Sequence, residues 1–270
     1  MMNKKTQHLL DSMLPNGKGV WVPIDHGASD FPLDGLHDIE NTIRQLIDAN
    51  VNAIIAQKGV ISAYSHLAKE TNTHMVAHLS VSTIHGGPDA SNKVLVGSVE
   101  ECIQRGADAV SCQINMGSDG EAAMIRAMGK ITSQAYKMNI PVLGMIYARG
   151  PHLRYHPEDE SKGQAHAIRL AFELGCDVAK TTYHPDPDVF SSMISGAPIP
   201  ILVAGGERTT NDLGVLQMVE QAIKLGASGV CMGRQIFGHP NPKSMASAIV
   251  AIVHNGASAT EAYEILKQTE

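Results

Sequence analysis

Short hydrophobic runs recur along the chain and alternate with longer segments of helical periodicity. The runs cover residues 19–25, 52–58, 74–80, 107–115, 141–147, 177–183, 200–206 and 229–236. Most are hydrophobic without alternation, as in Pro-Ile-Leu-Val-Ala-Gly-Gly at 200–206, which is typical of parallel strands covered on both faces. Eight strand and helix units in series predict an α/β fold, a single (β/α)8 TIM barrel.

The segments between the runs have the spacing of amphipathic helices. Within 38–49, Ile39, Ile43, Leu46 and Ile47 share one helical face, so a helix is predicted there.

Glycine ends two of the expected helices just before a strand. Gly106 and Gly175 are each followed two residues later by an aspartate, Asp108 and Asp177. Glycine tolerates the left-handed conformation that ends many helices.

One further helix and one insertion are expected near the middle of the chain. A helix is predicted over 121–136, with Ser118 or Asp119 as its N-cap. Residues 151–162, rich in Pro, His and acidic side chains, are expected to form a loop after the fifth strand.

Composition narrows the class of protein. No linker or change of composition divides the 270 residues, so one domain over 1–270 is expected. Hydrophobic residues make up 43% of the chain but aromatic residues only 4%, so the core must consist mainly of aliphatic side chains and Met. The net charge is −6 without a run of Lys and Arg, so we expect a small-molecule substrate and no nucleic acid.

The cysteines and the N-terminal segment bear on location. Cys102, Cys112, Cys176 and Cys231 are isolated, outside any metal-binding spacing, and are expected to be reduced, buried thiols. No segment resembles a signal peptide or reaches the roughly 18 apolar residues of a membrane span. We therefore expect a cytoplasmic protein without membrane attachment.

Three of the 13 histidines, His74, His78 and His85, lie close together in the sequence. His74 and His78 would be about 13 Å apart along a strand, too far to share one ion. Neither a metal nor another cofactor is therefore expected.

Lys180 is the most informative candidate for chemistry. Active sites of these barrels lie at the C-terminal ends of the strands, and Lys180 lies in the sixth run, where an unpaired ammonium would be costly. Burial is expected to lower its pKa, and a neutral amine attacks a ketone to form an iminium. Lys58, at the end of the second run, is a rival, and either lysine could instead extend into solvent.

Asp25 and Tyr147 end the first and fifth runs. Alone, each is compatible with a capping carboxylate or a packing residue. In a barrel, however, both can converge on Lys180 from separate strands. An aldolase needs an amine as electron sink and groups that move protons, and these three side chains suit those tasks.

Two glycine sites end the last two runs. Gly205 and Gly206 follow the seventh run, and Gly233 and Arg234 lie in the eighth, where barrels of this kind commonly bind phosphate. Each site alone is compatible with a plain tight turn. Together, with Arg234 able to make a charge-assisted contact, they favour a phosphate site.

Seven motifs carry a resemblance to the archaeal-type class I aldolase family over residues 21–266. They are Pro-Ile-Asp-His-Gly-Ala-Ser (23–29), Gly-Ala-Asp-Ala-Val-Ser (106–111), Asn-Met-Gly-Ser (115–118), Met-Ile-Tyr-Ala-Arg-Gly (145–150), Ala-Lys-Thr-Thr-Tyr (179–183), Val-Ala-Gly-Gly (203–206) and Met-Gly-Arg-Gln-Ile-Phe (232–237). Within the family, the chain most resembles the 2-amino-3,7-dideoxy-D-threo-hept-6-ulosonate synthases.

The resemblance implies that Lys180 forms the Schiff base, Tyr147 donates a proton and Asp25 accepts one. It implies a phosphorylated keto sugar and an aldehyde as substrates, and a homo-oligomer, often a decamer. The implied substrate contacts are His26, Gly27, Ala28, Ser29, Ala148 and Arg149, with Gly205, Gly206, Gly233 and Arg234 at the phosphate.

Two positions depart from the family pattern. Ala148 stands where Pro is usual, and Glu207-Arg208 follow Gly-Gly where Pro-Lys is usual. The acidic Glu207 weakens the local positive field, which bears on the sugar phosphate that is bound.

The leading hypothesis is a metal-independent class I aldolase that joins a keto sugar phosphate or dihydroxyacetone phosphate unit to aspartate semialdehyde. The alternatives are a class I fructose-bisphosphate aldolase, a coenzyme A-dependent thiolase, a class II metal-dependent aldolase and a non-catalytic phosphosugar-binding barrel. A pure binding protein would not need Asp25, Tyr147 and Lys180 together.

Overall fold

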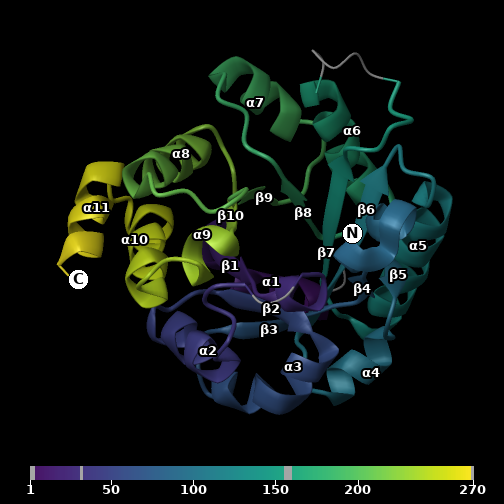
Figure 1. The fold of residues 1–270 in the computed structure, drawn as a ribbon, viewed down its shortest axis with the longest axis horizontal. Coiled ribbons are helices and arrows are strands. Elements are labelled where there is room, and N and C mark those ends of the chain that lie inside the picture. Colours follow the sequence, from purple (N-terminus) through teal and green to yellow (C-terminus); the bar gives the residue numbers. More distant parts are fainter. Residues whose placement is uncertain (1–3, 31–32, 155–159, 269–270) are drawn as a thin grey trace.

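The computed structural model describes residues 4–30, 33–154 and 160–268. Its parallel strands close into a barrel in the order β1, β10, β9, β8, β7, β6, β3, β2 (Figure 1). The strands are β1 Gly19–Pro23, β2 Ala53–Gln57, β3 His74–His78, β6 Ala109–Met116, β7 Val142–Ala148, β8 Val178–Thr181, β9 Ile201–Ala204 and β10 Gly229–Cys231. The predicted (β/α)8 barrel is confirmed.

Helices surround the barrel in chain order (Figure 1). They are α2 Ile39–Asp48, α3 Lys58–Tyr64, α4 Val99–Gln104, α5 Glu121–Met138, α6 Glu160–Glu173, α7 Pro187–Ile194, α8 Asp212–Lys224, α9 Arg234–Phe237, α10 Pro242–Asn255 and α11 Ala259–Lys267. In α2, Ile43 and Leu46 are fully buried, and the Asp38 side chain accepts a hydrogen bond from the Asn41 backbone N–H. The apolar stripe and the cap together explain why this segment is helical.

Shorter elements complete the described chain. They are α1 Lys4–Met13, the antiparallel pair β4 Ser80–Val81 and β5 Val94–Leu95, and the 3-10 turns η1 Pro15–Gly17, η2 Asp25–Ala28, η3 Ser65–Ala68 and η4 Ile84–Ser91.

The N-terminal half of the barrel interior is filled by a hydrophobic cluster, here called the plug. Its members are Trp21, Ala53, Ile55, Val76, Ala109, Leu143, Met145, Val178, Leu202 and Cys231 from the strands, with Leu10, Met13 and Leu14 from α1 and its end. Trp21 Nε1 donates a hydrogen bond to the Met13 carbonyl oxygen at 3.1 Å. Helix α1 therefore closes the barrel at this end.

The two Gly-X-Asp turns have equivalent contacts. Gly106 and Gly175 have φ values of 102° and 84°, as the helix-ending prediction requires. Asp108 accepts a hydrogen bond from the Met75 N–H at 2.9 Å, and Asp177 accepts one from Val142 at 2.8 Å. Each aspartate thus satisfies a backbone donor at the start of the preceding strand.

Six of the predicted strands end earlier than expected, and in three of them a residue of the predicted strand begins a helix or a 3-10 turn. Asp25 begins the η2 turn, Lys58 begins α3, and Arg234 begins α9. At Gly233 an added Cβ would lie 2.4 Å from the Pro23 carbonyl oxygen. The chain turns out of the sheet here, and only glycine permits this approach.

The middle of the chain also requires corrections. The N-cap of α5 is Gly120, without a side-chain cap, because Ser118 donates to the Asn115 carbonyl oxygen and Asp119 pairs with His152 instead. Of the expected loop 151–162, residues 151–154 are irregular and 160–162 belong to α6, while 155–159 lie outside the described residues.

Candidate active site

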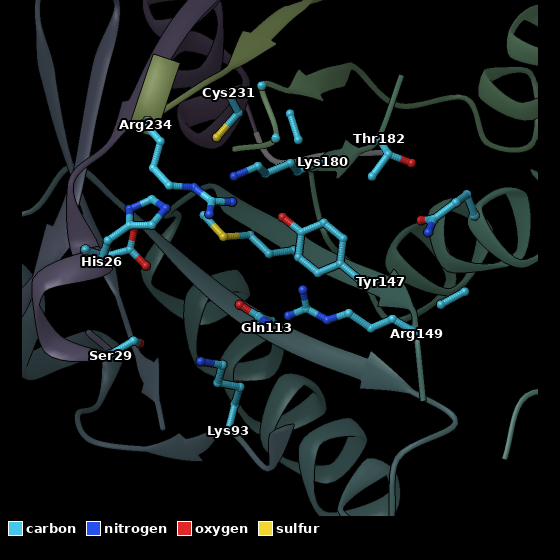
Figure 2. A pocket seen from close by; sticks show the side chains of 18 of the residues that line it. His26, Ser29, Lys93, Gln113, Tyr147, Arg149, Lys180, Thr182, Cys231 and Arg234 are labelled. Atoms are coloured by element: carbon cyan, nitrogen blue, oxygen red, sulfur yellow. The ribbon is translucent and has the colours of Figure 1, made fainter. Parts of the chain in front are cut away.

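A cavity of about 610 Å³ opens at the C-terminal ends of the strands, here called the mouth (Figure 2). Most of the candidate residues line it: Asp25, His26, Ser29, Tyr147, Ala148, Arg149, Lys180, Gly205, Gly206, Gly233 and Arg234. Gly27 and Ala28 do not, because they lie on the exposed part of η2. The barrel thus collects residues from five separate stretches of sequence into one cavity.

Lys180 lies in β8, paired in register with Met145 of β7 and Leu202 of β9. It is only 9% exposed, and two residues before it Val178 belongs to the plug. Because side chains alternate along a strand, both positions face the barrel axis. The amine hydrogen bonds to the Tyr147 hydroxyl oxygen and lies beside the Cys231 thiol.

The ionisation of Lys180 differs from the sequence prediction. Burial lowers its pKa, but the negative charge that Cys231, Tyr147 and Asp25 can carry, together with the hydrogen bond to Tyr147, outweighs burial and raises the pKa above its ordinary value. The expected neutral amine is therefore wrong for the resting site, where the side chain is an ammonium ion. It becomes a nucleophile only after it gives up a proton.

Asp25 lies between two histidines. Its carboxylate oxygens are 3.7 Å from His26 Nδ1 and 3.8 Å from His78 Nε2. Burial raises the pKa of Asp25, but His78, His26, Lys180 and its own backbone N–H together lower it below the ordinary value. Asp25 is therefore a carboxylate at neutral pH and can accept a proton.

Both histidines are neutral at neutral pH. Burial lowers the pKa of His26 to about 4 and also lowers that of His78. His78 is held in place by Ser111, whose Oγ lies 2.8 Å from its Nδ1. The sequence drew attention to His78 only as a metal ligand. Its position at the end of β3 facing Asp25 required the barrel.

Tyr147 extends from β7 into the centre of the cavity (Figure 2). The Arg149 guanidinium lies over its ring, 4.7 Å from the ring centre. The phenol is thus held between Lys180 and Arg149, with its hydroxyl directed at the amine. Such a group can exchange a proton with a substrate bound on Lys180.

The glycine end of the cavity suits an anion. An added Cβ at Gly205 would lie 3.0 Å from the side chains of Gln235 and Met232, so this packing leaves little room for a side chain, whereas the position of Gly206 is open. Gln235, which is buried, donates to the Gly205 and Glu207 carbonyl oxygens and holds this loop. Arg234 enters the cavity beside it (Figure 2).

The departure at Glu207-Arg208 has a structural explanation. Arg208 forms an ion pair with Asp212 at 2.9 Å and does not line the cavity. Glu207 is 89% exposed and lies 3.6 Å from Arg234, an arrangement in which the ion pair is weak. Arg234 is therefore the cation of this end, and Arg208 does not replace the family's lysine.

Lys58, the rival lysine, is not part of the cavity. It begins α3 and pairs with Glu101 at 3.1 Å. An amine held by a carboxylate outside the cavity is unsuited to attack a substrate.

Several cavity residues were missed from the sequence: Lys93, Gln113, Gln164, Thr182 and Cys231. Gln113 and Cys231 occur within hydrophobic runs, and their inward alternation would have indicated them. The Gln164 Oε1 atom is buried without a hydrogen-bond partner among the described residues. Cys102, Cys112 and Cys176 are free and buried like Cys231, as predicted.

Residues 4–30, 33–154 and 160–268 contain neither a candidate metal centre nor a membrane-spanning helix. No group of three or more His, Cys, Asp or Glu side chains there is arranged to hold a metal ion. No helix there is long and apolar enough to span a membrane.

A closed barrel with a buried lysine, a phenol and a carboxylate meeting in its mouth has the architecture of a Schiff-base aldolase. Residues 20–239 match the family described as DeoC/LacD family aldolase. The chain belongs to this family and is a class I aldolase.

Its relatives agree with this assignment. The 2-amino-4,5-dihydroxy-6-oxo-7-(phosphonooxy)heptanoate synthase of Streptomyces griseus is 37% identical, over 88% of this chain and 85% of that protein. The 2-amino-3,7-dideoxy-D-threo-hept-6-ulosonate synthase of Halobacterium salinarum is 39% identical, over 87% and 86%. A solved Schiff-base-forming fructose-1,6-bisphosphate aldolase has a TM-score of 0.82 at 27% identity, covering 93% of this chain and 100% of that one.

Proposed function

We propose that this aldolase is of the 2-amino-3,7-dideoxy-D-threo-hept-6-ulosonate synthase type: it binds a phosphorylated keto donor as an iminium on Lys180 and joins a carbon unit of that donor to aspartate semialdehyde. The observation that carries the proposal is the buried Lys180 amine beside Tyr147 and Asp25, in one cavity with the glycine and Arg234 anion site. The names of the Halobacterium and Streptomyces relatives support this substrate class.

The proposed chemistry follows from these positions. The Lys180 ammonium first gives a proton to the Asp25 carboxylate, and the free nitrogen attacks the ketone carbon. The carbinolamine hydroxyl takes that proton back and leaves as water, and the resulting iminium withdraws electrons from the neighbouring carbon. That carbon, as an enamine, attacks the aldehyde carbon of the acceptor. Asp25 accepts the proton that the carbon beside the iminium loses as the enamine forms. Tyr147 supplies the proton that the new hydroxyl needs. Water then frees the product and restores Lys180.

A second candidate is a fructose-bisphosphate aldolase with glyceraldehyde 3-phosphate as acceptor. The similarity to the solved Schiff-base-forming aldolase favours it. Rates measured with each aldehyde separate the two, because activity with glyceraldehyde 3-phosphate alone would contradict the first proposal.

Borohydride reduction tests the Schiff base itself. Incubation with dihydroxyacetone phosphate and borohydride should add the reduced ligand mass at Lys180 and abolish activity. Lys180→Met should show no adduct and no activity, whereas Lys58→Met, the control, should behave as wild type. An adduct on Lys58, or full activity in Lys180→Met, would contradict the assignment.

We further propose that residues 1–270 act as one domain within a cytoplasmic homo-oligomer, and that this homo-oligomer is a decamer. Free, buried cysteines are usual in a reducing compartment and support the location. Light scattering tests the oligomer, and a monomer would contradict it.

A further inference from the structure

We propose that Lys93 and Arg149 form a second anion subsite in the cavity, which binds the carboxylate of the aldehyde acceptor. This inference rests on the proposed aldolase function and adds to it the residues that bind the carboxylate of the acceptor. Lys93 lies outside the seven sequence motifs, and the names of the relatives assign it no role.

The two cations come from separate elements and line the same side of the cavity. Lys93 immediately precedes β5, and Arg149 immediately follows β7. In Figure 2 both side chains extend toward Gln113, whereas Arg234 enters the cavity from another side. The cavity therefore has two cationic ends.

A single buried amide organises this subsite. Asn115 is 2% exposed, and its Oδ1 accepts hydrogen bonds from Arg149 Nε at 2.9 Å and Gln113 Nε2 at 2.8 Å. Its Nδ2 donates to the carbonyl oxygen of Ser91, two residues before Lys93. The Nε contact orients the guanidinium while its two terminal nitrogens are left for a ligand.

The two cations lack a carboxylate partner. Among the described residues neither Lys93 nor Arg149 forms an ion pair, although Lys93 is half-buried. Burial and the Arg149 charge lower the pKa of Lys93 more than the Asp25 charge raises it. Like charges held close destabilise each other, and an anion bound between them offsets that repulsion.

The donor groups favour a carboxylate over a phosphate. The subsite offers one ammonium and the free edge of one guanidinium, which match the two oxygens of a carboxylate. The glycine end offers exposed backbone in addition to Arg234, which suits a phosphate with more oxygens. The donor phosphate and the acceptor carboxylate would therefore bind to different cations of the same cavity, Arg234 for the phosphate and Lys93 with Arg149 for the carboxylate.

Three acceptors with a common donor test the inference: aspartate semialdehyde, glyceraldehyde 3-phosphate and uncharged propanal. Lys93→Met should raise the KM for aspartate semialdehyde about 10- to 100-fold, the loss expected for one hydrogen bond to a charged group. The KM for propanal should change less than about twofold, because propanal has no anion to lose. Lys93→Arg should recover most of the affinity, and Lys58→Met should match wild type.

Each contrary outcome has a defined meaning. Equal losses for all three acceptors would overturn the subsite, and a larger loss for glyceraldehyde 3-phosphate would overturn the carboxylate. Borohydride trapping of the donor on Lys180 should be unchanged in Lys93→Met, which shows that the variant is folded; if it is not, Lys93→Gln is assayed in the same way. Absence of trapping in the wild type would instead contradict the proposed function.

Discussion

The two halves of the barrel interior are built from the same strands but differ in chemistry. In β8, Val178 belongs to the plug and Lys180, two residues later, lines the cavity. In β3, Val76 belongs to the plug and His78, two residues later, lies beside Asp25. Each pair occupies successive inward positions of one strand. In these two strands a step of two residues separates the hydrophobic half from the reactive half, whereas Met145 and Cys231 belong to the plug and also line the cavity.

The hydrophobic plug allows the fold to accommodate a buried charge. Each fully buried plug side chain stabilises the fold by about 1.5–3 kcal/mol, which offsets the cost of desolvating Lys180 above it. Since the plug and α1 close the barrel below, Lys180 has polar neighbours only in the mouth. The plug should therefore govern stability and the mouth should govern turnover.

The largest expected effect is on turnover, at Tyr147. Tyr147→Phe removes the proton-transferring hydroxyl but leaves the Lys180 amine, so turnover should fall about 100- to 10,000-fold while the borohydride adduct still forms. Steady-state rates and mass spectrometry measure the two effects. Loss of the adduct together with turnover would assign Tyr147 a role in holding Lys180 instead.

The next effect is on stability, at Trp21 in the plug. Trp21→Ala removes a fully buried ring and its hydrogen bond to Met13, so the free energy of unfolding should fall by about 3–5 kcal/mol. Urea unfolding measures this loss. Trapping at Lys180 per folded molecule should be unchanged, and a loss of trapping would show that the two halves are not separable.

A smaller effect is expected on donor binding, at Arg234. Arg234→Met should raise the KM for a phosphorylated donor about 10- to 100-fold, because a charge-assisted contact is lost. Unphosphorylated dihydroxyacetone should be much less affected. Arg208→Met is the matched control, since Arg208 pairs with Asp212 outside the cavity, and a greater loss there would reverse the assignment.

The smallest effect concerns pH and Asp177, at the closed end of the barrel. Burial raises the pKa of Asp177 to about 6, although the Val142 N–H opposes this. As pH falls from above 6 toward 4, the Asp177 carboxylate is protonated in the folded state before it is protonated in the unfolded state. The contribution of Asp177 to the free energy of unfolding therefore becomes more favourable to the folded state at the lower pH. Asp177→Asn should therefore stabilise the protein by about 1 kcal/mol at pH 8 and not at pH 4.

Thermal unfolding of Asp177→Asn beside Asp108→Asn checks this expectation. Asp108 makes the equivalent backbone contact but has His74 at 3.5 Å, so its replacement should bring no gain at pH 8. A gain for both variants would show that burial of Asp177 is not the cause.

The sequence by itself determined the fold and the position of the main reactive groups. Continuous hydrophobic runs predict strands covered on both faces, and Gly106 and Gly175 mark helix ends, because these properties depend on local backbone and burial. The motifs also located Lys180, Tyr147 and Asp25, which the barrel brings into one cavity.

Only the tertiary structure decided how these groups behave. Lys58 is excluded by Glu101, and the pKa of Lys180 is raised because Tyr147 and Cys231 come from other strands. The proximity of Lys93 and Arg149 likewise depends on contacts between segments that are distant in the sequence. Electrostatic interactions act through space and are strong where water is excluded, so their sign follows from three-dimensional neighbours and not from the local sequence pattern.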